Sequence, residues 1–203
     1  MDKIECDFNQ FDVPHGHFSC TSTAFLCARF FLEVQPTKDD LHRILHAGGK
    51  VWNQWYMNQQ QEVGIRHNFQ YWKDVVRSFP GIMNDVKVVY ETNGVVGQEL
   101  DDSSKNFLLT TLEDALEHVR TSDTPKSSVL TIDNASYAIN ANNQYIYFFD
   151  SHGKSNLFGA GDGAYYIRVR NHADMVDYLN DFLGHCYGSE FTLVVFEFEG
   201  TTS

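Results

Sequence analysis

Two residues near position 150 have the types and the spacing needed for proton transfer. The stretch Tyr145–Gly153 is an apolar, aromatic run that ends in Asp150, Ser151, His152 and glycine. Its aromatic and β-branched residues favour a strand buried on both faces. Positions i and i+2 of an extended chain point to the same side. We therefore expect the Asp150 carboxylate to orient one ring nitrogen of His152 and to leave the other free for proton transfer.

This pair lacks a nucleophile, and Cys20 is the cysteine best placed to provide one. The segment Ser19–Leu32 opens with small hydroxyl residues and then becomes apolar, which predicts a central helix buried on most sides. The free N–H groups and the dipole at a helix start favour a thiolate there. A Cys–His–Asp hydrolase uses this combination of residues. The alternative is an unreactive cysteine buried in a helix, the usual environment of a free cysteine.

Other cysteines and histidines offer weaker alternatives; they are Cys6, Cys27, Cys186, His15 and His17. The cysteine spacings contain no C-x-x-C or zinc pattern, so we expect free thiols. The two histidines lie on a loop too close to Cys20 in sequence to turn back onto it. A metal site built from them and His152 has no acid or cysteine at a usual ligand spacing. We therefore expect no metal and no cofactor.

Composition and charge narrow the class of protein further. The chain has 203 residues, 42% apolar and 21% charged, and a net charge of −12. This charge argues against a nucleic-acid partner and suits a basic one. No run has the length of a membrane helix, and Met1–Glu5 shows no apolar signal segment. An intracellular, cytoplasmic location is therefore expected, with no membrane partner.

The elements that must position these residues fall into two groups. The chain from Ser19 to Phe79 is expected to be mostly helical, after a loop over residues 1–19. The expected helices are Ser19–Leu32, Thr37–His46, Val51–Gln61 and Phe69–Phe79, with Gly48-Gly49 ending the second. The rest alternates strands with two helices, Thr111–Arg120 and His172–Leu183.

The second group of elements, which follows the helical part of the chain, is expected to form a mostly antiparallel sheet. The expected strands are Val86–Tyr90 with a return at Val95-Val96 after an Asn93-Gly94 hairpin, Ser128–Ile132, Ser136–Asn140, Tyr145–Asp150, Tyr165–Val169 and Phe191–Phe198. Asp133-Asn134 supplies one turn, and a Gly-rich loop covers Phe158–Gly163. Helices followed by such a sheet indicate one α+β domain over residues 1–203, helical over about 19–80 and sheet over about 84–199.

Taken together, these motifs resemble a known family. An N-terminal Gln10, a cysteine at the start of a central helix and a Phe-Asp-Ser-His-Gly sequence ending at Gly153 are similar to the deubiquitinase domain of herpesvirus large tegument proteins and tegument-like deubiquitinases. The resemblance spans nearly the whole chain. It implies a papain-like cysteine protease in which Cys20 is the nucleophile, His152 the base and Asp150 the orienting acid. It also implies that Gln10 donates a hydrogen bond to the oxyanion.

The chain departs from this family just before the cysteine. The family commonly has a glutamine there, whereas this chain has His17-Phe18-Ser19 before Cys20. Asn9 is therefore an alternative oxyanion donor. The resemblance implies hydrolysis of isopeptide bonds at the C-terminal glycine of ubiquitin by a monomeric enzyme, with ubiquitin or polyubiquitin chains as partners. Trp52–Tyr56 and Phe158–Ala164 are candidates for lining the passage of the ubiquitin tail.

Two other functions stay open at this point. One is another papain-like enzyme, such as a deamidase or a protease of ubiquitin-like modifiers, with the same three residues acting on a different acyl donor. The other is a catalytically silent ubiquitin-binding or interaction module in which Cys20 is merely buried. The two differ in the reactivity expected of the Cys20 thiol.

Overall fold

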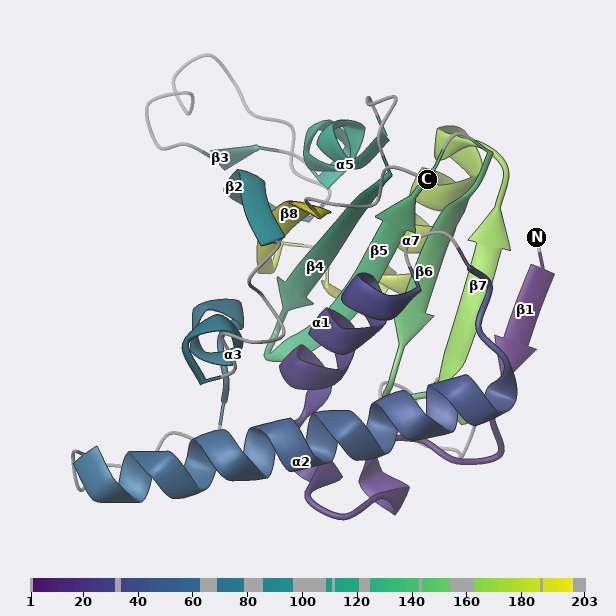
Figure 1. Cartoon of the computed structure of the whole chain (residues 1–203). Helices are drawn as coiled ribbons and strands as arrows, with labels where there is room; N and C mark the ends of the chain where they lie inside the picture. The colour runs from purple at the N-terminus through teal and green to yellow at the C-terminus, as the bar shows by residue number, and fades with distance from the viewer. Residues whose placement is uncertain are drawn as a thin grey trace.

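An eight-stranded sheet with helices on both of its faces forms the framework of the protein (Figure 1). The computed structural model describes residues 2–31, 34–62, 69–78, 86–96, 109–110, 112–120, 125–142, 144–153, 163–186 and 188–198. The strand order is β1-β7-β6-β5-β4-β8-β2-β3. The β2–β3 pair is parallel and the other pairs are antiparallel.

The strands are β1 (Asp2–Glu5), β2 (Val86–Val95), β3 (Leu109–Thr110), β4 (Lys126–Ile132), β5 (Ala135–Ala141), β6 (Ile146–Asp150), β7 (Tyr165–Val169) and β8 (Glu190–Phe198). The helices are α1 (Cys20–Phe30), α2 (Lys38–Glu62), α3 (Trp72–Ser78), α5 (Leu112–Arg120) and α7 (His172–Phe182). Short 3-10 helices are η1 (Gln10–Asp12), η2 (Gly16–Phe18) and η4 (Gly184–Cys186).

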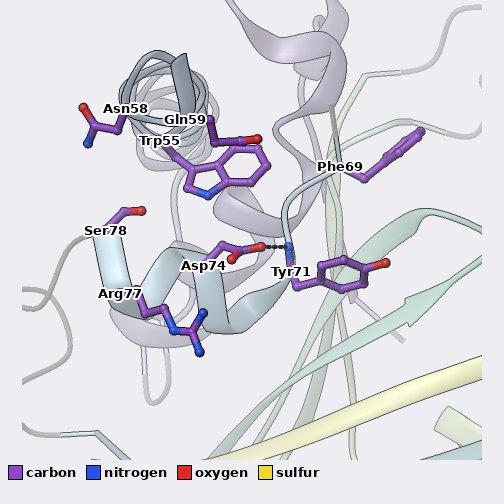
Figure 2. A pocket seen from close by; sticks show the side chains of 8 residues that line it. All are labelled: Trp55, Asn58, Gln59, Phe69, Tyr71, Asp74, Arg77 and Ser78. Carbon is purple, nitrogen blue, oxygen red and sulfur yellow. Dashed lines mark hydrogen bonds between the residues drawn. The ribbon is translucent and has the colours of Figure 1, made fainter. Parts of the chain in front are cut away.

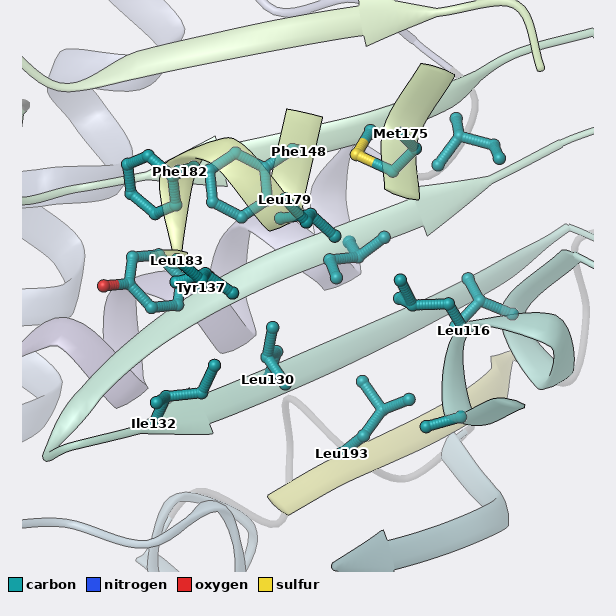
Figure 3. Close-up of a cluster of buried hydrophobic side chains, with 14 of the residues drawn as sticks. Leu116, Leu130, Ile132, Tyr137, Phe148, Met175, Leu179, Phe182, Leu183 and Leu193 are labelled. Atoms are coloured by element: carbon teal, nitrogen blue, oxygen red, sulfur yellow. The ribbon is translucent and has the colours of Figure 1, made fainter. Parts of the chain in front are cut away.

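Each face of the sheet has its own apolar core. On one face α1 lies across the central strands and α2 crosses α1 (Figure 1), and this core includes Phe25 and Phe149. On the other face α5 and α7 cover Phe148 and its neighbours (Figure 3). Every residue of β6 is buried. Because successive side chains of a strand point to opposite faces, β6 contributes alternately to the two cores.

Most elements predicted from periodicity are present. The buried helix after Ser19 is α1, the helix over Phe69–Phe79 is α3, and both C-terminal helices lie within a residue or two of their expected ranges. The strands β4, β5, β6, β7 and β8 are also where the pattern placed them. The mixture of helices with a mainly antiparallel sheet confirms the α+β class.

The predicted break at Gly48-Gly49 is wrong, because α2 runs without interruption from Lys38 to Glu62. A Cβ atom at Gly48 would lie 2.0 Å from Thr23 Oγ1, and one at Gly49 would lie 2.4 Å from the Pro14 carbonyl oxygen. These glycines therefore let α2 approach α1 and the N-terminal segment closely. Tertiary contact, rather than a helix stop, explains them.

The predicted Asn93-Gly94 hairpin is also wrong. β2 continues through both residues, with Asn93 opposite Thr192 and Gly94 opposite Phe191 of β8. The Thr192 hydroxyl donates a hydrogen bond of 2.7 Å to Asn93 Oδ1. Pairing along β8 therefore overrides the local turn preference of this dipeptide.

The N-terminal segment is more ordered than the expected loop. β1 pairs with β7 at the edge of the sheet, and two 3-10 helices follow before Cys20. The Gly-rich loop predicted at Phe158–Gly163 lies outside the described residues except for its last glycine. No helix in the described part of the chain combines the length and apolar character needed to cross a membrane.

Candidate active site

Cys20 is the first residue of α1 and is buried, with 5% of its surface exposed. Side-chain hydrogen bonds near both ends of α1 fix the helix against the sheet. The Thr21 and Ser136 hydroxyl oxygens lie 2.9 Å apart, and Ser127 at the other end donates to the Ala28 carbonyl oxygen at 2.5 Å. α1 thus holds the Cys20 thiol at a defined position above β5.

Asp150 and His152 form the pair expected at the end of β6. His152 Nδ1 lies 2.7 Å from Asp150 Oδ1, and the His152 backbone N–H donates to the same oxygen at 2.8 Å. Asp150 is fully buried and His152 is 8% exposed. The carboxylate therefore fixes both the backbone and the ring of His152, which leaves Nε2 as the nitrogen available for exchange of a proton.

Cys20 and His152 interact electrostatically. Burial alone would raise the pKa of the Cys20 thiol, but the hydrogen bond and positive charge of His152, with smaller contributions from Ser136 and Thr21, hold this pKa below its ordinary value. Burial would lower the pKa of His152, but its bonds to Asp150 and Cys20 raise it. Shifts of opposite direction favour a thiolate paired with an imidazolium, the reactive form of a cysteine nucleophile.

Within the described residues, the other three cysteines show the opposite behaviour. Burial raises the pKa of Cys6 and of Cys186 to about 11, and it raises the pKa of Cys27 well above its ordinary value. All three are buried free thiols. Cys20 is therefore the cysteine whose environment favours ionisation.

The turn between β4 and β5 lies against the thiol. Asp133 and Asn134 both adopt positive φ, 47° and 67°, as a tight hairpin turn requires. Cys20 Sγ lies 3.6 Å from the Asn134 carbonyl oxygen, within reach of a weak S–H hydrogen bond. The turn predicted at this dipeptide thus also forms a wall of the site.

Gln10 lies beside the end of β6. Its backbone N–H donates to the Ser151 carbonyl oxygen at 2.9 Å, and its Oε1 accepts from the Ser151 hydroxyl at 2.6 Å. Gly16 packs so closely on this segment that a Cβ there would lie 1.6 Å from the Gln10 carbonyl oxygen. These contacts hold Gln10 next to Cys20 and His152.

The alternative donor, Asn9, has a different environment. Its Oδ1 accepts the Phe11 backbone N–H at 2.9 Å, and the Asp12 carboxylate accepts its backbone N–H at 2.8 Å. This is a capping box at the start of η1. Asn9 is not among the described residues that line the cavity around Cys20.

A cavity of about 190 Å³ opens over the thiol. Its lining consists of aromatic and polar side chains around the reactive pair; they are Gln10, Phe11, His17, Phe18, Cys20, Phe69, Asp133, Asn134, Ala135 and His152. His17, which the sequence predicts to be a loop histidine, lies in η2 and packs edge-on against Phe11, with 5.4 Å between the ring centroids. Neither Phe11 nor Phe69 carries a sequence motif that could have assigned it to the site.

Figure 2 shows the residues that line a larger cavity of about 610 Å³. Phe69 lines both this cavity and the one over the thiol. Trp55 lines the larger cavity from α2, Asp74 lines it from α3, and Tyr71 lines it from the position just before α3. Trp52, in the stretch predicted to line the tail passage, packs on Phe18 and Tyr56. Among the described residues, no group of three or more His, Cys, Asp or Glu side chains is arranged to hold a metal ion.

Comparison with known proteins gives a match by fold. No protein-family model matches the sequence, and no curated protein matches it significantly. The structure is similar to the ubiquitin-specific protease encoded by a murine cytomegalovirus tegument protein, solved in complex with a ubiquitin-based suicide substrate. The TM-score is 0.75 at 15% identity, over 100% of this chain and 89% of the viral chain. At this identity the similarity shows a shared fold.

Proposed function

We propose that the protein is a deubiquitinase of the papain-like, tegument-related type. The observation that carries the proposal is the Cys20–His152 pair, in which the pKa of the thiol is lowered and that of the imidazole is raised beside Asp150. The pair faces a cavity on a fold similar to that of a viral ubiquitin-specific protease. A buried structural cysteine would have a raised pKa, as Cys27 does.

The proposed reaction begins with the thiolate. Cys20 Sγ attacks the carbonyl carbon of the C-terminal glycine of ubiquitin, and the carbonyl oxygen becomes an oxyanion. The C–N bond to the target lysine then breaks as the imidazolium of His152 gives its proton to the leaving amine. Water adds to the thioester and gives a proton back to His152. The C–S bond then breaks, which restores the Cys20 thiolate beside the His152 imidazolium, and ubiquitin leaves with a free carboxyl group whose proton passes to the solvent.

Gln10 is the proposed side-chain donor to the oxyanion, together with the Cys20 backbone N–H at the start of α1. Gln10 lines the cavity and lies beside the base. Asn9 is a poor alternative, because its side chain is held in the cap of η1 and it is not among the described residues that line the cavity. Donors that are fixed before the reaction stabilise the developing charge with little reorganisation.

Labelling with a ubiquitin suicide probe tests the proposal. The wild-type protein and Cys186→Ala should form a covalent adduct of one ubiquitin, whereas Cys20→Ala should form none. Cys186→Ala is a matched control because it also removes a buried thiol. Adduct formation by Cys20→Ala would contradict the assigned nucleophile. Reaction only with probes of ubiquitin-like modifiers would favour a different acyl donor, and no reaction with any probe would favour a binding module.

A further inference from the structure

We infer that Ser151, the middle residue of the Asp-Ser-His tripeptide, is a positioning residue that orients the Gln10 carboxamide for the oxyanion. This inference rests on the proposed function. It assigns a role to a residue whose side chain neither binds the base nor lines the cavity. The tripeptide would then supply the acid, the base and the orientation of the oxyanion donor from three consecutive positions.

Ser151 holds Gln10 at two points. The Gln10 backbone N–H donates to the Ser151 carbonyl oxygen at 2.9 Å, and the Ser151 hydroxyl donates to Gln10 Oε1 at 2.6 Å. Both side chains are buried, each with 1% of its surface exposed. The residues are 141 positions apart in sequence, so the contact joins the N-terminal segment directly to the end of β6.

The side-chain hydrogen bond determines which end of the amide is available. With Oε1 held by Ser151, the Nε2 hydrogens are the groups that Gln10 can offer to a carbonyl oxygen in the cavity. A flipped amide would present its oxygen to the developing oxyanion, where it would repel the charge. The hydroxyl can also accept, so a flip would still allow a hydrogen bond between the two side chains.

The hydroxyl proton of Ser151 disfavours that flip. In the described part of the structure, Gln10 Oε1 is the acceptor recorded for this proton. After a flip, Nε2 would donate to the hydroxyl and leave its proton buried without an acceptor. A buried donor without an acceptor is unfavourable, because it has lost its hydrogen bond to water and gained none in return. Ser151 therefore selects the amide orientation that is productive for catalysis.

A double-mutant cycle tests the inference. Wild type, Ser151→Ala, Gln10→Ala and the double variant are compared for hydrolysis of a fluorogenic ubiquitin amide and of p-nitrophenyl acetate. Both substrates form an oxyanion during acylation of Cys20. Ser151→Ala should lower kcat on the order of tenfold with KM within about twofold, since a hydrogen bond that orients a transition-state donor acts on turnover. In the Gln10→Ala background, Ser151→Ala should cause no further loss.

Two controls separate orientation of Gln10 from general damage. Ser128→Ala also removes a buried hydroxyl, one that donates at 2.8 Å to the Ile139 carbonyl oxygen within the sheet, and it should leave kcat unchanged. Alkylation of Cys20 by iodoacetamide forms no oxyanion, so Ser151→Ala should keep the wild-type alkylation rate and pH profile. A slower alkylation in Ser151→Ala would mean that the ion pair is disturbed and would overturn the inference.

The remaining outcomes are also decisive. Full kcat in Ser151→Ala, or an equal loss in the presence and absence of Gln10, would overturn the positioning role. If the wild type hydrolyses p-nitrophenyl acetate but not the ubiquitin amide, the proposed function fails. The acetate cycle then still decides the role of Ser151, because its oxyanion forms on the same thiol.

Discussion

At the scale of single residues, the division of work between His152 and Asp150 follows from their contacts. His152 carries the proton, whereas Asp150 holds the ring through Nδ1 at 2.7 Å. We predict that His152→Ala lowers kcat/KM for a fluorogenic ubiquitin substrate by about 10³–10⁴-fold, the upper range for loss of a proton carrier. Asp150→Asn should lose less than His152→Ala, because the imidazole that carries the proton is still present. Equal activity of His152→Ala and wild type would exclude His152 as the base.

The opposite pKa shifts of Cys20 and His152 predict a particular pH dependence. The ion pair is present above the lowered pKa of the thiol and is lost as pH rises through the raised pKa of His152. The rate of alkylation by iodoacetamide should therefore rise at a pH below the free-cysteine value of about 8.5. In His152→Ala only the smaller contributions of Ser136 and Thr21 still oppose burial, so this rise should move above about 8.5. An unchanged profile in His152→Ala would show that the two groups are not coupled.

Part of this site could be predicted from local sequence. Cys20 follows residues that are typical of a helix start, and Asp150 and His152 lie two positions apart at the end of a predicted strand. The residues next to them in the sequence are therefore enough to indicate their roles. The contact of Ser151 with Gln10 joins residues 141 positions apart, and no pattern within either segment indicates it. Phe11 and Phe69 line the cavity but could not be predicted, because no pattern in the sequence around either residue indicates this position.

At the scale of elements, the crossing of α1 and α2 depends on Gly48. Alanine in a helix interior is ordinarily favoured over glycine by about 1 kcal/mol. Here its Cβ would lie 2.0 Å from Thr23 Oγ1 and 2.9 Å from Thr23 Cα. We predict that Gly48→Ala lowers Tm by about 3–8 °C despite the better helix propensity, because overpacking must displace backbone. Thermal unfolding followed by circular dichroism measures this change.

Gly184→Ala is the matched control for Gly48→Ala. Apart from its neighbours in the chain, no atom of the described residues would lie within 4 Å of a Cβ at Gly184, so this substitution should leave Tm nearly unchanged. Displacement of Thr23 should also reach the start of α1, because its hydroxyl oxygen lies 3.4 Å from that of Ser19, next to Cys20. Gly48→Ala should therefore also slow the alkylation of Cys20. A Tm equal to or above the wild-type value would refute the close helix crossing.

The elements predicted correctly are those whose burial is visible in their own sequence. The strands β4 to β6 are apolar runs bounded by turn residues, and α1 is apolar on nearly all sides. β1 was missed because Asp2–Glu5 is a half-exposed edge strand, and its pairing with β7 involves Arg168 and other residues far along the chain. Gly48-Gly49 and Asn93-Gly94 misled for a related reason: contacts with distant segments override their local preferences.

At the scale of the whole molecule, the two cores share one set of strands. Phe148 and Phe149 are neighbours on β6, yet Phe148 belongs to the core under α7 and Phe149 to the core under α1. Loss of either core would expose one face of the same central strands. We therefore propose that the chain folds as one domain and predict a single cooperative unfolding transition.

Two independent signals can follow this transition in urea. Fluorescence of Trp52, Trp55 and Trp72 reports on α2 and α3, on one face of the sheet. Hydrogen exchange of α7 amides, measured by mass spectrometry, reports on the opposite face. The two signals should have the same midpoint.

Phe148→Leu and Phe149→Leu, each destabilising by about 1 kcal/mol, should shift the midpoints of both signals together, whichever face of the sheet is changed. If Phe148→Leu lowered the midpoint of α7 exchange and left that of tryptophan fluorescence unchanged, the two faces would be separate folding units.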